Sequence, residues 1–331
     1  MTDTVLILGA SGRFGRASTE AFARAGWRVR TLGRRSVPEL VPGNDVHGAT
    51  IEHHRGEPLD APTLDAAADG VDVVVHAINP PYGRWCRDAV PLARATARAA
   101  GRAGATVLLP GNVYAYGAAL PARLDETTPF APSESLGRTR RDVEAVFREA
   151  LDVRTIVLRA GDFIEGRRSG NWFEDHIVDR LDAGRVTYPG PLDRAHAWAW
   201  LPDMAAAAVG LAAARARLAP FETVGFPGWT LTGEELVAAL ERIMGRPLAV
   251  RSMPWWALRA VAPFSGNVRG VLSMRWLWER EHAIDGRRLA ELLPDFRPLE
   301  AEAGLALALE RLGPPLPGAA PTLAATTGSA R

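Results

Sequence analysis

The sequence predicts an α/β fold, built as a doubly wound parallel sheet with a smaller C-terminal lobe. Short β-rich apolar runs alternate with Ala-rich helical stretches through the first half of the chain, which is the order that right-handed strand–helix–strand crossovers produce. A glycine-rich turn directly follows the first run. After about residue 165 the segments become longer and less regular. These features together indicate one sheet followed by a second lobe.

The apolar runs are the expected strands. Thr4–Leu8 is typical of a strand that is buried on both faces of a parallel sheet, and five later runs repeat this pattern with varying strength. The predicted strands are 4–8, 27–32, 50–54, 72–76, 106–109 and 154–158. The clearest predicted helices are 84–103, 135–150, 202–217 and 232–244.

Composition excludes several classes of function. The 331 residues include 39 Lys and Arg against 38 Asp and Glu, and this net charge of +1 predicts no attraction to nucleic acid or to a membrane. Cys86 is the only cysteine, which excludes an internal disulfide and a Cys-ligated structural zinc. The adjacent His53 and His54 would point to opposite faces of a strand, so no metal site is predicted. No leader-like segment and no long uncharged apolar run is evident, so a cytoplasmic protein is expected.

The glycine-rich turn predicts a dinucleotide site. Gly9, Gly12 and Gly15 stand where the first strand ends and a helix begins. Gly9 allows the tight turn, Gly12 lets the backbone approach a pyrophosphate, and Gly15 lets the helix pack closely on the strand. The free N–H groups and the dipole of the helix N-terminus then face the phosphates. Ser11 and Phe14 of the same turn are expected to contact the cofactor.

The end of the second strand favours NADP over NAD. An NAD site usually has Asp or Glu there to accept hydrogen bonds from the ribose. Here the strand is followed by Arg34 and Arg35, and the next acid is Glu39. Two guanidinium groups suit a 2′-phosphate, and Arg13 of the glycine turn is expected to reach the same phosphate.

The predicted organisation has three parts. Residues 1–165 are expected to form a Rossmann-type NAD(P)-binding domain, with later segments returning to it. Residues 166–312 are expected to form mainly a substrate-binding lobe, and residues 313–331 a flexible tail. Eight of the ten tryptophans lie in the second half. They either pack the second lobe onto the sheet or line an apolar or aromatic substrate pocket.

With these motifs the chain resembles an extended or atypical short-chain dehydrogenase/reductase, the NAD(P)-dependent epimerase/dehydratase-like group, over roughly residues 4 to 310. The glycine spacing is that of this group, and the stretch 112–117 resembles its S-x-x-V-Y-G segment. The resemblance implies that Glu57 meets the adenine. It also implies that Ala77 and Asn79, at the end of the fourth strand, line the cofactor.

The catalytic positions depart from the group's pattern. Asn112 stands in the place of its serine. The Y-x-x-x-K pair aligns on Leu136 and Arg140, so that a leucine replaces the tyrosine and an arginine replaces the lysine. A leucine can neither donate nor accept a proton. The group's usual acid/base mechanism therefore cannot be carried over.

Two tyrosines are candidates for the missing acid. Asn112 and Tyr114 would share one face of an extended segment, where Tyr114 could deliver a proton and Asn112 could hydrogen-bond the substrate oxygen. Arg140 could lower the pKa of that phenol or hold the nicotinamide ribose. Tyr82, in a Pro-Pro-Tyr loop after the fourth strand, is the second candidate. The pair Asp162–Phe163 follows the sixth predicted strand. Ligands of open α/β sheets bind at the carboxyl ends of the strands, so this pair is expected near the nicotinamide. The alternative is that it anchors a loop.

The sequence leaves more than one function open. The first hypothesis is an NADP-dependent oxidoreductase that acts on a small-molecule carbonyl or alcohol, apolar or aromatic, with a non-standard acid/base set. The alternatives are a redox-silent NADP-binding sensor and a relative of the nucleotide-sugar epimerases and dehydratases. A homodimer is compatible with each of them.

Overall fold

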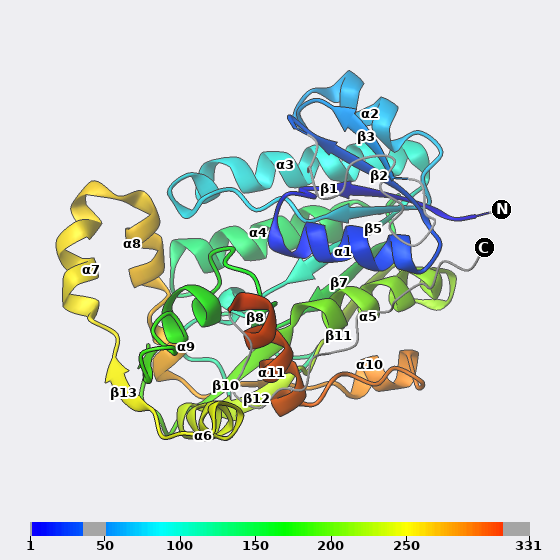
Figure 1. The fold of residues 1–331 in the computed structure, drawn as a ribbon. Coiled ribbons are helices and arrows are strands. Elements are labelled where there is room, and N and C mark those ends of the chain that lie inside the picture. Colours follow the sequence, from blue (N-terminus) through cyan, green and yellow to red (C-terminus); the bar gives the residue numbers. More distant parts are fainter. Residues whose placement is uncertain (1, 36–50, 314–331) are drawn as a thin grey trace, which may run out of the picture.

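The computed structural model describes residues 2–35 and 51–313. Its centre is a parallel sheet of seven strands in the order β11-β7-β5-β4-β1-β2-β3 (Figure 1). Chain order reverses on the two sides of β1, as in doubly wound folds. The strands are β1 (Thr4–Leu8), β2 (Arg28–Gly33), β3 (Ile51–Arg55), β4 (Val73–His76), β5 (Thr106–Gly111), β7 (Thr155–Arg159) and β11 (Phe221–Gly225).

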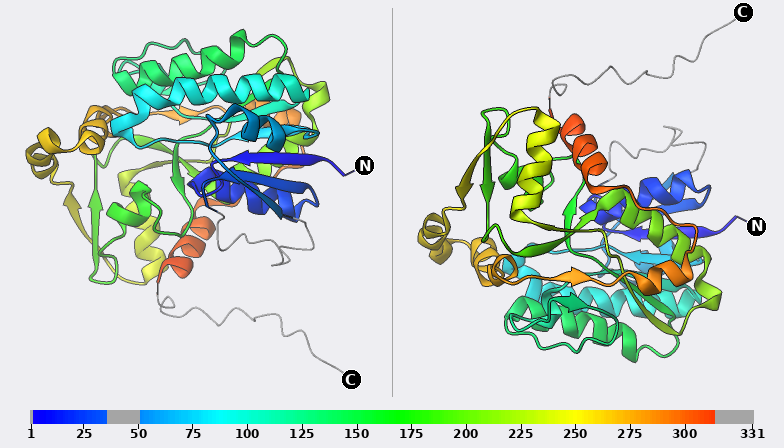
Figure 2. Two further views of the ribbon diagram at one scale, coloured as in Figure 1. Left: turned by 90° about the horizontal axis from the view of Figure 1, so that it is seen from above. Right: turned by 90° about the horizontal axis from the view of Figure 1, so that it is seen from below.

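Helices cover both faces of this sheet, which is why its central strands are largely apolar. Helices α1 (Arg13–Arg24) and α5 (Leu201–Ala213) pack together on one face. Helices α2 (Ala61–Ala68), α3 (Tyr82–Ala103) and α4 (Ser135–Glu149) cover the other, as the two views of Figure 2 show. All residues of β1, β4 and β7 are buried.

The prediction of a doubly wound parallel sheet is confirmed. Each of the six predicted strands is present, with ends that differ by at most two residues. The seventh strand, β11, was not predicted as a strand. It pairs in parallel with β7, with Phe221 opposite Thr155, so a segment far along the chain returns to the edge of the sheet.

The second lobe is built from small sheets and short helices. One sheet has the order β12-β10-β8, and two further pairs are β13-β9 and β14-β6. These strands are β6 (Arg123–Leu124), β8 (Asp162–Ile164), β9 (Arg185–Tyr188), β10 (Ala195–Trp200), β12 (Trp229–Thr232), β13 (Ala249–Ser252) and β14 (Ala283–Ile284). The helices of the lobe are α6 (Gly233–Met244), α7 (Trp255–Val261), α8 (Gly266–Ser273), α9 (Trp276–Glu279) and α11 (Ala301–Leu312). Helix α10 (Arg287–Leu292) packs against β11 of the central sheet instead. Single turns are η2 (Tyr114–Tyr116), η3 (Phe173–Ile177), η4 (Arg215–Arg217) and η5 (Ala262–Phe264), of which η3 is π-helical and the others are 3₁₀.

Most tryptophans of the second half pack the core of this lobe. Five of them are buried, and their rings make edge and stacked contacts with one another and with His196. The five are Trp198, Trp200, Trp229, Trp255 and Trp278. The packing interpretation therefore holds for the majority. Trp172 is only half-buried, and Trp256 is exposed.

A helical hairpin made of α7, η5 and α8 projects from the body at the left of Figure 1. We call residues 255–273 the α7–α8 hairpin. Within residues 2–35 and 51–313, no helix is long and apolar enough to cross a membrane.

Candidate active site

A single cleft of about 1370 Å³ runs along the carboxyl ends of the central strands. It lies at the point where strand order reverses between β1 and β4, the usual ligand position in open α/β sheets. Fourteen of the fifteen residues predicted for the site line it, and Gly15 is the exception. The fourteen are Gly9, Ser11, Gly12, Arg13, Phe14, Arg34, Arg35, Glu57, Ala77, Asn79, Tyr82, Asn112, Tyr114 and Arg140.

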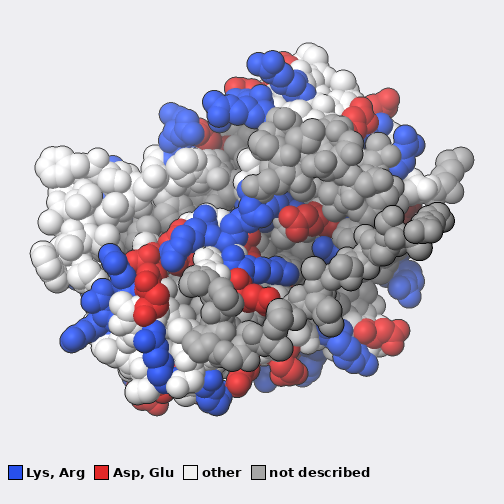
Figure 3. Space-filling model, in the orientation of Figure 1, with Lys and Arg blue, Asp and Glu red and all other residues white. Residues whose placement is uncertain are grey.

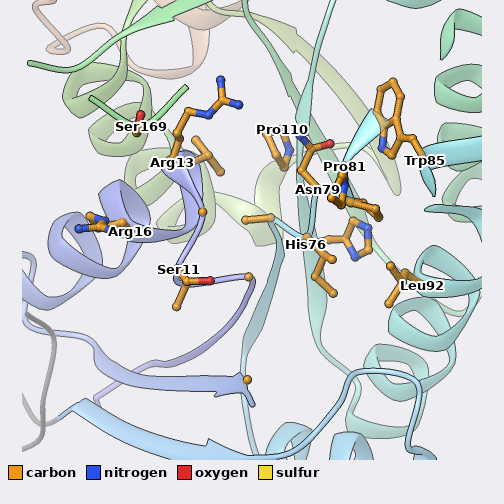
Figure 4. Close-up of a pocket in the computed structure, with 18 of the residues that line it drawn as sticks. Ser11, Arg13, Arg16, His76, Asn79, Pro81, Trp85, Leu92, Pro110 and Ser169 are labelled. Atoms are coloured by element: carbon orange, nitrogen blue, oxygen red, sulfur yellow. The ribbon is translucent and has the colours of Figure 1, made fainter. Parts of the chain in front are cut away.

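The glycine turn forms one wall of the cleft (Figure 4). Gly9 has φ +88°, and a Cβ on it would lie 2.7 Å from the carbonyl oxygen of Ala77. A Cβ on Gly15 would lie 2.1 Å from the oxygen of Gly9, so Gly15 serves the packing of helix on strand rather than the cleft. Gly12 is the N-cap of α1, and no side chain caps the helix. The first N–H groups of α1 are thus left for an anionic group, and the turn fits a pyrophosphate.

The opposite end of the cleft carries the two arginines that follow β2. Arg34 and Arg35 are exposed, and both line the cleft together with Glu57, which follows β3. No carboxylate belongs to β2 or to these two residues. Glu39 lies outside the described residues. The guanidinium groups are therefore available to an anion bound at this end.

Arg13 does not point to this end, so that prediction is wrong. Its Nη1 donates a hydrogen bond of 2.8 Å to Oδ1 of Asn171 in the second lobe, and Figure 4 shows Arg13 beside Ser169. The amide of Asn171 is fixed in turn, because its Nδ2 donates to Glu165 at 3.0 Å. Asn171 is buried. This fixed acceptor draws the guanidinium across the cleft, and Arg13 thereby joins the two walls.

The loop that carries Asn171 is held by a buried acid. Oε1 of Glu174 accepts hydrogen bonds from the N–H groups of Glu165 at 2.7 Å and Gly166 at 3.2 Å. Its second oxygen is buried with no hydrogen-bond partner. Burial raises the pKa of Glu174 to about 7, and the carboxylate of Glu165 adds to the shift. Around neutral pH this wall of the cleft therefore rests on a carboxyl that is partly protonated.

We expect the stability of the protein to fall as pH rises between about 4.5 and 7, through Glu174. The folded pKa is above the unfolded value of 4.5, so the folded state holds the extra proton in this window, and the loss grows to at most about 3 kcal/mol above pH 7. Glu174→Gln keeps the accepting oxygen and removes the titration. Urea unfolding at pH 5 and pH 8 should then show a flatter pH dependence than wild type.

Asp179→Asn, which alters an exposed ion pair nearby, is the control and should keep the wild-type dependence. Parallel profiles for wild type and Glu174→Gln would contradict the assignment.

The two candidate tyrosines meet in the cleft. The hydroxyl oxygens of Tyr82 and Tyr114 are 2.7 Å apart, within one hydrogen bond. The ring of Trp85 contacts both of theirs. Tyr82 is the first residue of α3 rather than part of a loop, because Pro81 at the N-cap position starts the helix two residues earlier than predicted.

Asn112 and Tyr114 do not share a face of an extended segment. The strand ends at Gly111, and Tyr114 begins the 3₁₀ turn η2. The carbonyl oxygen of the Asn112 side chain accepts from the N–H of Tyr114 at 3.1 Å, and this bond replaces strand pairing. Gly137 of α4 lets the helix approach, since a Cβ there would lie 2.4 Å from the oxygen of Tyr114. The side chain of Asn112 therefore orients Tyr114.

Burial raises the pKa of both phenols. For Tyr114 the neighbouring Tyr82 and the carboxylate of Asp162 add to the shift, while Arg13 opposes it. For Tyr82, Asp162 adds and Arg13 opposes in the same way. Burial outweighs the effect of Arg13, so the pair holds both protons at neutral pH. Arg140, which was expected to lower the pKa of Tyr114, does not bring that pKa below its usual value.

Arg140 is held within a buried ion cluster. Its Nε donates to Glu144 at 3.1 Å, and an Nη donates to the carbonyl of Pro110. Glu144 also accepts from Arg159 at 2.7 Å. Leu136, one turn before Arg140, is buried in the hydrophobic core and is not among the residues that line the cleft. Leu136 therefore serves the packing of α4.

Several residues of the cleft were not assigned a role from the sequence. His76 ends β4, its Nδ1 lies 2.8 Å from the hydroxyl of Thr96, and burial lowers its pKa to about 3. Asp162, on β8, lines the cleft and lies 2.9 Å from Nε2 of His196 behind it. Asn171 and Glu165 come from the second lobe. Two of these positions were anticipated without a chemical role: His76 at the end of the fourth strand, and Asp162 from its place after a strand.

A metal site is not evident in the part of the chain that the structure describes, where no three His, Cys, Asp or Glu side chains are grouped suitably.

Comparison with known proteins gives a family and a fold. The model of the NAD dependent epimerase/dehydratase family matches residues 5–224. No curated protein sequence matches the chain. A putative epimerase from Burkholderia cenocepacia J2315 is 19% identical, with a TM-score of 0.75 over 94% of this chain and 98% of that one.

Two other solved structures are similar over comparable lengths. UDP-glucose 4-epimerase from Thermotoga maritima, solved with UDP-glucose, is 17% identical, with a TM-score of 0.72 over 93% of this chain and 98% of that one. The dTDP-glucose 4,6-dehydratase DesIV from Streptomyces venezuelae, solved with NAD, is 18% identical, with a TM-score of 0.69 over 93% and 96%. At these identities the similarity establishes the fold.

Proposed function

Because the chain belongs to the NAD dependent epimerase/dehydratase family, we propose that it binds a nicotinamide dinucleotide and acts on a carbon bearing an alcohol or carbonyl oxygen. The observation that carries this proposal is one continuous cleft that joins the glycine turn to the Tyr82–Tyr114 pair. A bound nicotinamide would supply or take up a hydride. The protein's own residues would position the substrate oxygen and move its proton.

Tyr114 is the proton donor in this proposal. Its Oη would donate a proton to a substrate carbonyl oxygen, and the proton of Tyr82, 2.7 Å away, would then be shared between the two phenol oxygens. The proton lost to the product would be replaced from solvent before the next turnover. The raised pKa values keep the pair protonated before the reaction, and Asn112 orients Tyr114 through its backbone N–H. Two linked phenols would thus replace the tyrosine that Leu136 displaces.

A nucleotide-linked sugar is the first substrate class to test, because such sugars are named with the solved structures of similar fold. If the sugar were first oxidised and then reduced within the same site, the cofactor would end in the redox state in which it began. The second class is an apolar or aromatic alcohol or carbonyl, which the side chains of Trp85, Phe163 and Trp172 along the cleft would suit. That reaction would consume cofactor in proportion to product.

The test is to incubate the protein with NADP+ or NAD+ and a panel of UDP- and dTDP-sugars, and separately with NADPH or NADH and a panel of aromatic ketones and aldehydes. Sugar conversion with no net change in absorbance at about 340 nm supports the epimerase/dehydratase reaction. Stoichiometric consumption supports a net oxidoreductase. Tight cofactor binding with no turnover of any member would favour the sensor.

We expect NADPH to bind about tenfold or more tightly than NADH. Arg34 and Arg35 can each give a charge-assisted hydrogen bond of about 1.5–3 kcal/mol to a 2′-phosphate. Calorimetric dissociation constants at moderate salt measure the preference, and the Arg34→Ala, Arg35→Ala double variant should lose it.

Arg28→Ala is the matched control, because this exposed arginine begins the same strand at its far end. Equal affinities for the two cofactors in the wild-type protein would refute the NADP assignment.

A further inference from the structure

The α7–α8 hairpin exposes aromatic side chains that the rest of the described chain does not cover. Trp256 is 75% exposed and Phe264 is 91% exposed, and Val261 lies between them in sequence at 49%. Only two other large hydrophobic residues of the described chain are comparably exposed, Leu59 and Leu151. Single exposed hydrophobic residues are common on protein surfaces, whereas a group of them indicates an interaction site.

The segment around the hairpin is cationic, although the whole chain is almost neutral. No Asp or Glu occurs between Glu241 and Glu279, whereas this stretch contains six arginines: Arg242, Arg246, Arg251, Arg259, Arg269 and Arg275. Arg251, Arg259 and Arg269 are exposed and form none of the ion pairs found among the described residues. In Figure 3 the projecting end at the left is mostly uncharged on this face, and basic and acidic side chains lie together at its base.

We propose that the α7–α8 hairpin docks the protein onto an anionic membrane surface. Trp and Phe side chains would enter the headgroup region, and the arginines would face the anionic headgroups, as in interfacial amphipathic segments. The hairpin projects beyond the sheet and the lobe, so a flat surface can reach it (Figure 1). A second copy of the chain is a poorer occupant of this face. Its docking would bring two cationic segments together, and neither segment has an acidic residue between Glu241 and Glu279 to pair with the other.

The hairpin is fixed to the catalytic cleft rather than loosely attached. A Cβ on Gly270 of α8 would lie 2.6 Å from Tyr82, so only glycine allows this contact. The N–H of Gly83 donates to Oδ1 of Asn267 at 2.9 Å. The surface that we assign to the membrane is therefore anchored to the first turn of α3, beside the phenol pair.

The test is co-sedimentation of the full chain with vesicles of phosphatidylcholine alone or mixed with phosphatidylglycerol. We expect binding to the anionic vesicles only, and weaker binding at high salt. Trp256→Ser with Phe264→Ser should lower the partition coefficient about tenfold or more, and Arg251→Glu with Arg259→Glu should lower it similarly. Leu151→Ser is the matched control: Leu151 is 94% exposed, but it lies in the loop between α4 and β7, at the amino end of this strand and outside the hairpin.

A second measurement reports on the hairpin directly. Cys86 is the only cysteine, so Ala260→Cys in a Cys86→Ser background places one environment-sensitive dye beside Trp256. Its emission should shift to the blue on anionic vesicles, and the same dye at Leu151→Cys should not shift. Equal binding by the wild-type protein and the hairpin variants overturns the proposal. So does a concentration-dependent dimer that Phe264→Ser dissociates, with no vesicle binding, or capture of an acidic protein in place of vesicles.

Discussion

Tyr114→Phe is expected to lower kcat by about 10²–10⁴-fold, the usual cost of removing a positioned general acid. The substitution keeps the ring and deletes only the hydroxyl that lies 2.7 Å from Tyr82. Cofactor affinity and melting temperature should change little, because the backbone contacts of Tyr114 with Asn112 and Gly137 remain. Steady-state kinetics with a substrate identified as above, together with calorimetric cofactor binding, measure the effect.

Two further variants separate this role from packing. Tyr82→Phe should cost less, because it removes the hydroxyl that supports Tyr114 rather than the donor itself. Tyr116→Phe, in the same 3₁₀ turn but buried against Phe130 and not among the residues that line the cleft, should turn over normally. A larger loss in Tyr82→Phe than in Tyr114→Phe would make Tyr82 the acid. Normal turnover in both would mean that the proton comes from water or substrate.

Glu144→Gln is expected to lower the free energy of unfolding by about 3–5 kcal/mol, because it leaves two buried guanidinium groups without their counter-ion. Glu144 lies between Arg140 and Arg159, and the side chains of all three are at most 9% exposed. Burial opposes ionisation of Glu144, yet the two arginines hold the pKa of its carboxyl below the usual value. Denaturant unfolding at neutral pH gives the measurement.

Asp142→Asn provides the comparison on the same helix. Asp142 pairs with Arg141 at the surface, both side chains are about half exposed, and its replacement should cost at most about 1 kcal/mol. A loss in Glu144→Gln no larger than that in Asp142→Asn would show that water reaches the cluster and screens it.

The central sheet could be predicted from the sequence because its signal is local. A strand buried on both faces is apolar over most of its length, and β1, β4, β5 and β7 meet this requirement. The polar side chains that end β4 and β7, His76 and Arg159, are buried with hydrogen-bond partners. β11 has no such run: Phe221–Gly225 includes a glutamate and becomes a strand through pairing with β7. The short strands of the second lobe depend on pairing in the same way.

In the candidate site, too, the features with a local sequence signal could be predicted, and those that depend on contacts between distant segments could not. The glycines follow from backbone sterics, and the predicted positions line one cleft apart from Gly15. The direction of Arg13 depends on Asn171, which is 158 residues away in the chain, and no periodicity encodes that contact. The Tyr82–Tyr114 hydrogen bond likewise depends on where α3 and η2 meet. Both tyrosines were candidates from their positions in the sequence, but the hydrogen bond between them follows only from the fold.

The late return of the chain to the sheet determines how this protein can fold during synthesis. A nascent chain that ends near residue 165 lacks both β11, which pairs with β7, and α5, which packs beside α1. The backbone N–H and C=O groups along the outer edge of β7 would then stay unpaired, and Ile156 and Leu158 would lose the cover that buries them. Such an edge invites association with other chains. The ribosome must therefore release well over two hundred residues before the sheet can close, and a fragment cut at residue 165 should aggregate rather than fold.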